Sequence, residues 1–277
     1  MSRKNRYNDP VFKAGKKVIR RTLRALASSP PPHPDTVHRL RVCTKKLRAL
    51  LQLYRPRHTS AAIKAVELDV KRIADLYAGS RDAHVLLATL RQLNADNAIE
   101  PVLQYFSTQN TERQNALPDT DLPAIFANIL ERWQRELAAP GGTAFSSGLE
   151  YSYSRTRKLA RKATTSKDDQ RYHACRKWLK YYFYQLGLSG LDKNKGAARH
   201  RRQVGVLAER LGLLHDRCVV EAALVGLQQT EDNIDADLRA ACELALQRCR
   251  DQKQRDKQFC DRKFKRILSR RHSPLLS

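Results

Sequence analysis

The sequence predicts an all-α protein, and three observations support that fold class. Apolar residues recur at intervals of three or four in almost every segment that lies between prolines and glycines. No segment shows the sustained alternation of apolar and polar residues, bounded by turn residues, that predicts a β-strand. Two basic segments also repeat each other at a fixed interval, which is typical of duplicated helical units.

Proline, glycine and polar clusters divide the chain into a series of predicted helices. The run SSPPPHP (28–34) is too rich in proline to be helical, and APGGT (139–143) divides the chain into two parts. The predicted helices span about 10–27, 36–56, 60–78, 81–94, 99–117, 122–137, 145–164, 168–188, 195–213, 214–229 and 235–269.

The charge of the chain points to an anionic partner. Its 277 residues carry 53 Lys and Arg against 28 Asp and Glu, a formal net charge of +25, and 41% of them are hydrophobic. Such an excess opposes compaction by self-repulsion, so a nucleic acid, an anionic membrane surface or a polyphosphate would be a natural partner. We expect no signal peptide, no membrane span and a cytoplasmic location. The six cysteines form no C-x-x-C pair, and we expect them to be reduced residues of the core.

The segment from Val37 to Tyr54, VHRLRVCTKKLRALLQLY, is the helix around which the chain is organised. At ~100° per residue, one side of this helix is cationic and carries a histidine, whereas the opposite side is apolar. The cationic side holds His38, Arg41, Lys45 and Arg48, and the apolar side holds Leu40, Leu47, Leu51 and Tyr54. A row of like charges weakens a helix. These cations therefore lie either on a face that is simply solvated or on a surface that binds a polyanion.

This pattern recurs in the second part of the chain. His173, Arg176 and Lys180 repeat the spacing of His38, Arg41 and Lys45 with an offset of 135 residues. The segment 75–90 likewise aligns with 209–224, pairing Asp82 with Asp216, and we expect both aspartates to lie near the start of a helix, as complements to its dipole. We therefore predict one domain, residues 1–277, with a first half at about 10–117, a linking helix at about 121–138 and a second half at about 145–268. The two halves would pack with a pseudo-two-fold relation, with their basic faces opposed across a cleft.

These motifs resemble those of the CHAD domain family. VHRLRVCTKKLRALLQLY is similar to its first signature, H-x-x-R-x-x-x-[KR]-[KR]-x-R, and GLEYSYSRTRKLARKA followed by HACRKWLKYYFYQL is similar to the second. GSRDAHVLL resembles the R-D element of the family, and the likeness covers about residues 10–268. Tyr181 and Phe183 depart from it, because basic residues often stand at these positions. The second half is therefore expected to bind less strongly, or through other cations.

The resemblance implies two antiparallel helical bundles related by an approximate two-fold axis, with a basic central cleft or pore between them. It also implies that this domain is non-enzymatic and binds inorganic polyphosphate in that cavity, without a cofactor, a metal or catalytic residues. Association with polyphosphate granules is a further expectation. The matched contacts are His38, Arg41, Lys45, Lys46 and Arg48 in the first half and His173, Arg176, Lys177 and Lys180 in the second. Preceding basic helices add the candidates Lys13, Lys17, Arg20, Arg24, Arg157, Lys158 and Arg161.

Two alternatives stay open at this point. The same charge suits an RNA- or DNA-binding module, although the chain carries no zinc-finger, RRM or KH signature. Histidines beside a phosphate site would also suit a metal-dependent phosphohydrolase, although no H-E-x-x-H motif is present. Either histidine could instead be a packing residue that bonds a neighbouring carbonyl.

Overall fold

The computed structural model describes residues 10–29, 34–54, 61–76, 78–113, 120–135, 137, 141–188, 195–230 and 235–269. These residues form helices and no strand, so the all-α prediction is confirmed. The helices are α2 (Pro10–Ser28), α3 (Pro34–Tyr54), α4 (Ala61–Leu76), α5 (Ala78–Leu93), α6 (Glu100–Arg113), α7 (Leu122–Arg135), α8 (Gly141–Ser166), α9 (Asp169–Leu188), α10 (Lys195–Thr230) and α11 (Ala236–Ile267).

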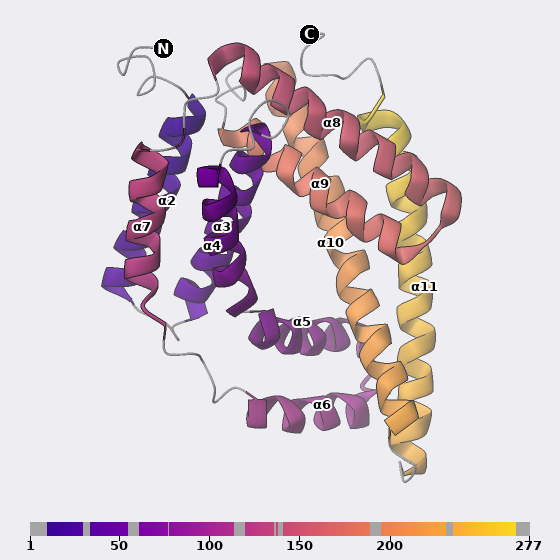
Figure 1. Ribbon diagram of the computed structural model, residues 1–277. Coiled ribbons are helices and arrows are strands. Elements are labelled where there is room, and N and C mark those ends of the chain that lie inside the picture. Colours follow the sequence, from indigo (N-terminus) through magenta and orange to yellow (C-terminus); the bar gives the residue numbers. More distant parts are fainter. Residues whose placement is uncertain are drawn as a thin grey trace.

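The helices form a frame in the view of Figure 1. On the left, α2, α3, α4 and α7 form a bundle, and α8 and α9 make an antiparallel hairpin across the top. The long helices α10 and α11 run antiparallel on the right, and α5 and α6 extend toward their lower ends. Helix α3 also packs against α8 and α9, so the two histidine-bearing helices are in direct contact.

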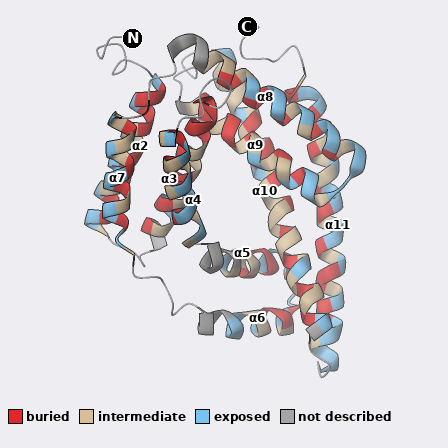
Figure 2. Cartoon of the chain, in the orientation of Figure 1, coloured by how far each residue is buried: buried red, intermediate tan, exposed pale blue. Residues whose placement is uncertain are grey.

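Two clusters of buried side chains hold this frame together. The larger one joins α2, α3, α4, α7, α8 and α9 to the first part of α10 and the end of α11. The smaller one joins α5 and α6 to the other ends of α10 and α11. Because each long helix enters both clusters, α10 and α11 connect the two cores, and their buried residues appear as interrupted stripes in Figure 2.

The predicted boundary near residue 213 is wrong. Residues 195–213 and 214–229 belong to one helix, α10, and Gly212 lies inside it. Leu211 and Leu214 on either side are both 1% exposed, so burial of these side chains outweighs the ~1 kcal/mol by which glycine weakens a helix interior. Asp216 consequently lies in mid-helix, and the proposed role at a helix start is also wrong for this residue. The predicted break at 139–143 is likewise too long, since α8 begins at Gly141.

Several other sequence predictions can be compared directly with the described residues. All six cysteines are free, and every one except the half-buried Cys218 is buried, which confirms the expectation of reduced core thiols. No described helix is long and apolar enough to cross a membrane. Asp82 is near the start of α5 as expected, but its side chain lies outside the described residues. The pseudo-two-fold relation between halves stays a prediction.

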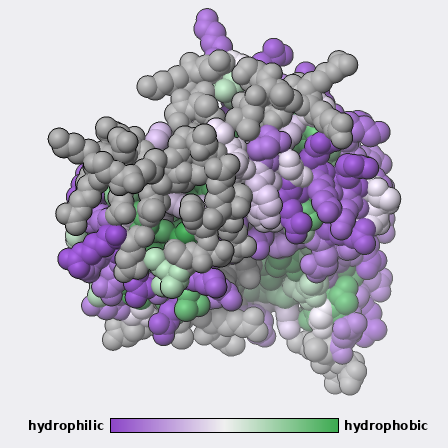
Figure 3. All heavy atoms as spheres, turned by 45° about the horizontal axis from the view of Figure 1, so that its top comes forward, coloured by the Kyte–Doolittle hydropathy of each residue, from purple (hydrophilic) through white to green (hydrophobic). Residues whose placement is uncertain are grey.

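The surface of the molecule is strongly polar. Hydrophilic side chains cover most of the right-hand part of the view in Figure 3, where α8 and α11 lie. Three large hydrophobic side chains are exposed among the described residues, namely Leu68, Tyr151 and Val206. The distribution of the Lys and Arg residues over the helices therefore decides where an anion could bind.

Candidate polyanion-binding site

Helix α2 contributes an uninterrupted set of cations. It begins at Pro10, a residue suited to a first helical position, and its 19 residues include six Lys and Arg and no acid. Its apolar residues, among them Phe12 and Ile19, are buried, while Lys17, Arg21 and Arg24 are exposed. The sequence pattern of α2 thus separates one buried side from one cationic side.

Contact with α7 fixes the orientation of α2. The indole of Trp133 lies where a side chain at Gly15 would be, because a Cβ atom there would stand 2.0 Å from a ring carbon. The same indole donates a hydrogen bond of 3.2 Å to the carbonyl of Phe12. Since Trp133 is fully buried, α2 cannot rotate without losing this contact, and its cations are held toward α3.

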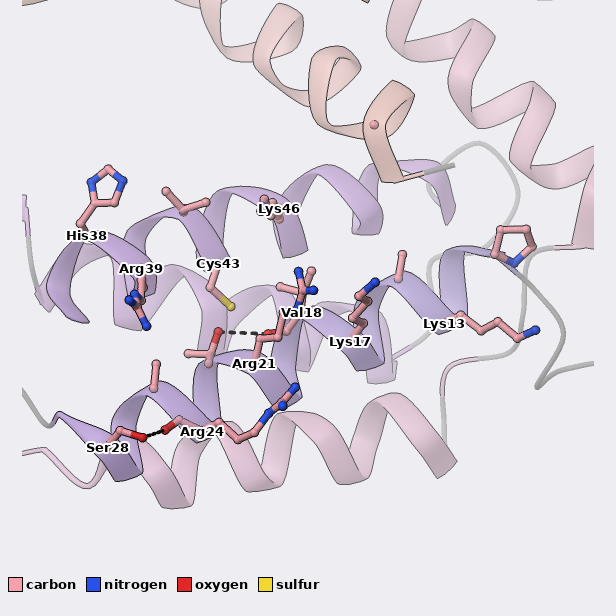
Figure 4. A pocket seen from close by; sticks show the side chains of 16 residues that line it. Lys13, Lys17, Val18, Arg21, Arg24, Ser28, His38, Arg39, Cys43 and Lys46 are labelled. Carbon is pink, nitrogen blue, oxygen red and sulfur yellow. Dashed lines mark hydrogen bonds between the residues drawn. The ribbon is translucent and has the colours of Figure 1, made fainter. Parts of the chain in front are cut away.

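A cavity of about 920 Å³ lies between α2 and α3, and we call it the α2–α3 groove (Figure 4). Its lining includes six Lys and Arg and one histidine, and none of its lining residues is acidic. These basic residues are Lys13, Lys17, Arg21 and Arg24 from α2 and His38, Arg39 and Lys46 from α3. Gly187 of α9 completes the wall, so the groove ends against the second half of the chain.

The cations of the groove are available to a ligand. Arg39 of α3 and Arg21 of α2 extend into the space between the two helices, and Arg24 runs along α2 (Figure 4). His38 lies at one end and points away from α2. Arg21, Arg24 and Arg39 form no ion pair with any described residue, and the same holds for Lys17 and Lys46. Guanidinium groups can bind phosphate oxygens in pairs, and ammonium groups add mobile point charges.

The floor of the groove is uncharged. Burial raises the pKa of the Cys43 thiol to about 12, while contacts with Thr22 and Lys46 oppose this effect. The Thr22 hydroxyl is satisfied by a 3.1 Å bond to the carbonyl of Val18. Because Cys43 and Thr22 are uncharged, they do not reduce the positive potential that the Lys and Arg side chains create in the groove.

The structure brings together only part of the predicted first-half site. Lys13, Lys17, Arg24, His38 and Lys46 line the groove as a set. Arg20 lines a neighbouring cavity of about 430 Å³ that shares Lys13, Lys17 and Arg24. The predicted contacts Arg41, Lys45 and Arg48 do not line the groove and occupy an adjacent face of α3.

Sequence reasoning missed Arg21 and Arg39. Arg21 stands four residues after Lys17, which is the spacing that places two side chains on one helix face, so a signal was present. Arg39 is adjacent to His38 but ~100° away from it around the helix, and the histidine row did not include it. Only the direction of α2 relative to α3 shows that Arg39 faces the groove.

The second histidine has different surroundings. His173 of α9 faces His215 of α10, with 3.0 Å between their Nδ1 atoms, in a separate cavity of about 340 Å³. Burial, with the charges of Arg176 and Lys177, lowers the pKa of His173 and favours its neutral form. His38 and His173 therefore line different cavities, and a single ligand site that contains both stays a prediction.

The remaining cations of the second half are distributed over two faces. Burial and the charge of Arg176 lower the pKa of Lys180, and the acids Glu209 and Asp216 of α10 oppose that shift. Lys177, Lys158 and Arg161 are exposed, while Arg157 is half-buried beside Tyr153. None of these residues lines the α2–α3 groove. Within the described part of the chain, no group of three or more His, Cys, Asp or Glu residues could hold a metal ion.

Comparison with known proteins places this architecture in a family. No curated protein matches the chain. The sequence model of the CHAD domain matches residues 17–225, which include most of α2, both histidine helices and most of α10. Because this match covers more than half of the chain, the protein belongs to the CHAD domain family, which is associated with polyphosphate binding.

Proposed function

We propose that this protein binds inorganic polyphosphate without catalysing a reaction, and that the α2–α3 groove is its principal site. The observation that carries the proposal is the composition of the groove: six Lys and Arg line it, and no acid does. Cations left without ion pairs repel one another, and a linear polyanion removes this repulsion along its whole length.

The spacing of the cations suits a chain of phosphates. Lys17, Arg21 and Arg24 follow one another at intervals of four and three residues, which rise by about 6 and 4.5 Å along α2. Arg39 and Lys46 supply charge from the other side, so a bound chain is gripped between two helices. Release of condensed counterions would add to the affinity, by analogy with nucleic acids.

The predicted contacts outside the groove would extend the site for long chains. Helix α3 carries Arg41, Lys45 and Arg48 on a face adjacent to the groove, and α9 packs against α3. A chain longer than the groove could therefore continue toward Arg176, Lys177 and Lys180. In this proposal the second half contributes less, because acids of α10 lie near Lys180.

Charge-reversal variants test the site. We expect Arg21→Glu with Arg39→Glu to lower the affinity for long-chain polyphosphate by roughly a hundredfold or more, since each charged hydrogen bond contributes about 1.5–3 kcal/mol. The matched control is Lys265→Glu with Arg266→Glu, an equal charge change at exposed positions at the end of α11. Titration calorimetry measures the affinities, and circular dichroism checks the fold.

A second pair of variants ranks the two candidate surfaces. Arg41→Glu with Arg176→Glu alters both histidine helices and leaves the groove residues intact. If this pair abolishes binding and the groove pair does not, then opposed histidine helices form the principal site and the groove is secondary. Equal small losses in both pairs and the control would refute both assignments.

The alternative functions have their own tests. A polyphosphate-binding groove should prefer long polyphosphate to duplex and single-stranded nucleic acid at matched charge and salt, and a reverse preference that Arg21→Glu with Arg39→Glu abolishes would favour the nucleic-acid hypothesis for the groove. Release of inorganic phosphate on addition of divalent metals would favour a phosphohydrolase. Association with cytoplasmic polyphosphate granules belongs to the same proposal, and co-localisation with stained granules would support it.

A further inference from the structure

A second cationic surface runs along α8, and we call it the α8 stripe. It consists of Tyr151, Arg155, Lys158 and Lys162, which are spaced three or four residues apart and fall within ~60° of one another around the helix. All four side chains are exposed. None of them lines the α2–α3 groove or the cavity of His173.

The charges of the stripe are uncompensated. Arg155, Lys158 and Lys162 form no ion pair with any described residue. Glu150 is the only acid in α8, and it lies ~100° away from Tyr151 around the helix and accepts a bond from Ser154. The stripe therefore presents three cations in a row, rising ~4.5–6 Å from one to the next.

Aromatic rings accompany these cations. Tyr151 is 42% exposed and packs edge-on against Trp178 of α9, with 5.6 Å between ring centroids. The Arg155 guanidinium lies 5.9 Å from the centroid of the Trp178 ring, and Tyr181 also packs edge-on against Trp178, with 5.6 Å between ring centroids. An exposed tyrosine beside a half-buried tryptophan, at the end of a row of cations, is a platform on which a flat ring could stack.

We propose that the α8 stripe and Trp178 bind single-stranded nucleic acid. Unpaired bases stack on aromatic side chains while the backbone phosphates follow a row of cations, and both components are present here. Polyphosphate has no rings and could use only the cations. Bases in a duplex are paired and stacked on each other, so they could not reach Tyr151. This surface is separate from the groove, and the inference does not depend on polyphosphate binding.

Tryptophan emission reports on this surface directly. The chain has two tryptophans, and Trp133 is fully buried, so Trp178 is the one that a ligand can contact. We expect a short oligo(dT) to quench the emission of the wild-type protein and long-chain polyphosphate to quench it much less. Equal quenching by both, or none by oligo(dT), would overturn the proposal whether or not polyphosphate binds in the groove.

Substitutions separate the ring from the charges. Loss of one stacked base corresponds to a roughly 5- to 150-fold lower affinity for oligo(dT) in Tyr151→Ala, while Tyr151→Phe retains the ring and the affinity. The matched control is Leu68→Ala, which removes an exposed hydrophobic side chain from α4. A loss in Leu68→Ala equal to that in Tyr151→Ala would contradict the stacking contact.

The charge contribution is measured by the salt dependence. Lys158→Gln with Lys162→Gln should lower the slope of log affinity for oligo(dT) against log salt by about 1.4, since each phosphate contact with a single strand contributes about 0.7. Lys265→Gln with Arg266→Gln removes the same charge elsewhere and should leave that slope nearly unchanged. If the two pairs change the slope equally, the binding is a property of net charge and the stripe is not a site.

Discussion

The α2–α3 groove and the junction of α9, α10 and α11 are both rich in basic residues, but they use them differently. The groove has no acidic lining residue, and five of its Lys and Arg form no ion pair with described residues. At the α9–α11 junction, Lys253 of α11 pairs with Asp169 of α9 and Glu221 of α10, and Arg210 and Arg217 of α10 pair with the fully buried Asp256 of α11. Cations at the junction form ion pairs between helices, whereas these five cations of the groove are available to a ligand.

The two histidine motifs show the same contrast. Their residue types and spacing are nearly identical and both histidines are exposed, yet His38 lies at the end of the groove, whereas His173 is in contact with His215. The difference arises from the neighbouring helices, since α2 brings only cations to the first motif and α10 brings Glu209 and Asp216 close to the second. A repeated motif therefore does not determine a repeated environment, and the acids of the partner helix decide between structure and binding.

The largest effect is expected from Asp256→Ala at the junction. This carboxylate is fully buried between Arg210 and Arg217, and its Oδ1 lies 3.1 Å from the guanidinium of Arg210. Removing one partner of a buried ion pair leaves an uncompensated charge and costs roughly 3–5 kcal/mol. Urea unfolding should show this loss in the free energy of unfolding.

The corresponding change in the groove serves as the control. Arg21→Ala should leave stability within about 0.5 kcal/mol of the wild type, because Arg21 is exposed and no acidic residue lines the groove beside it. A large loss in Arg21→Ala, or a small one in Asp256→Ala, would break the distinction between binding cations and structural cations.

The next effect concerns the packing that orients the groove. Gly15→Ala should destabilise the protein by roughly 1–3 kcal/mol, because its new Cβ would overlap the buried Trp133 ring, even though alanine favours a helix. Gly212→Ala is the matched control: apart from the adjacent backbone and neighbours of its own helix, no atom lies within 4 Å of its Cβ position, so stability should rise by about 0.5–1 kcal/mol. Thermal unfolding compares the two, and equal shifts would mean that Trp133 does not fix α2.

A smaller effect is expected in the binding of polyphosphate. Arg24→Gln should reduce the slope of log affinity against log salt by about one, by analogy with phosphate contacts in nucleic acids. Arg266→Gln on α11 changes the net charge equally and should leave the slope unchanged. A slope that is the same in both variants would show that the groove is not the place where phosphates are neutralised.

Helix positions were largely predictable from the sequence, because apolar spacing and proline breaks are local signals. The continuity of α10 through Gly212 was not, since it depends on burial of Leu211 and Leu214 against other helices. The grouping of basic residues on one face of a helix was also predictable, because it follows from their spacing. Which of them borders a cavity depends on how α2 is turned by Trp133, and this explains why Arg21 and Arg39 were missed while Arg41 was included.

The smallest effect is the pH dependence that separates His173 from the acids of the junction. Because the pKa of His173 is lowered in the folded protein by burial, Arg176 and Lys177, its neutral form contributes stability above its ordinary value of 6.5. That contribution is lost as the pH falls from 6.5 through the lower pKa of His173 in the folded protein, because the histidine takes up its proton in the unfolded chain first. Protonation of both His173 and His215 would also place two positive charges at the 3.0 Å Nδ1 contact.

The carboxylate of Asp169 affects stability at a lower pH than His173 does. Although burial opposes ionisation, hydrogen bonds from Lys253 and Lys257 lower the pKa of Asp169 in the folded protein. The ionised Asp169 therefore contributes stability above pH ~3.9, and this contribution is lost as the pH falls through its lower pKa in the folded protein. Unfolding measured from about pH 7.5 to about pH 5.5 should therefore show a loss of stability that His173→Gln diminishes, because this window contains the histidine and not the carboxylate. An identical loss in the wild type and in His173→Gln over this window would mean that the α9–α10 histidine contact does not couple to folding.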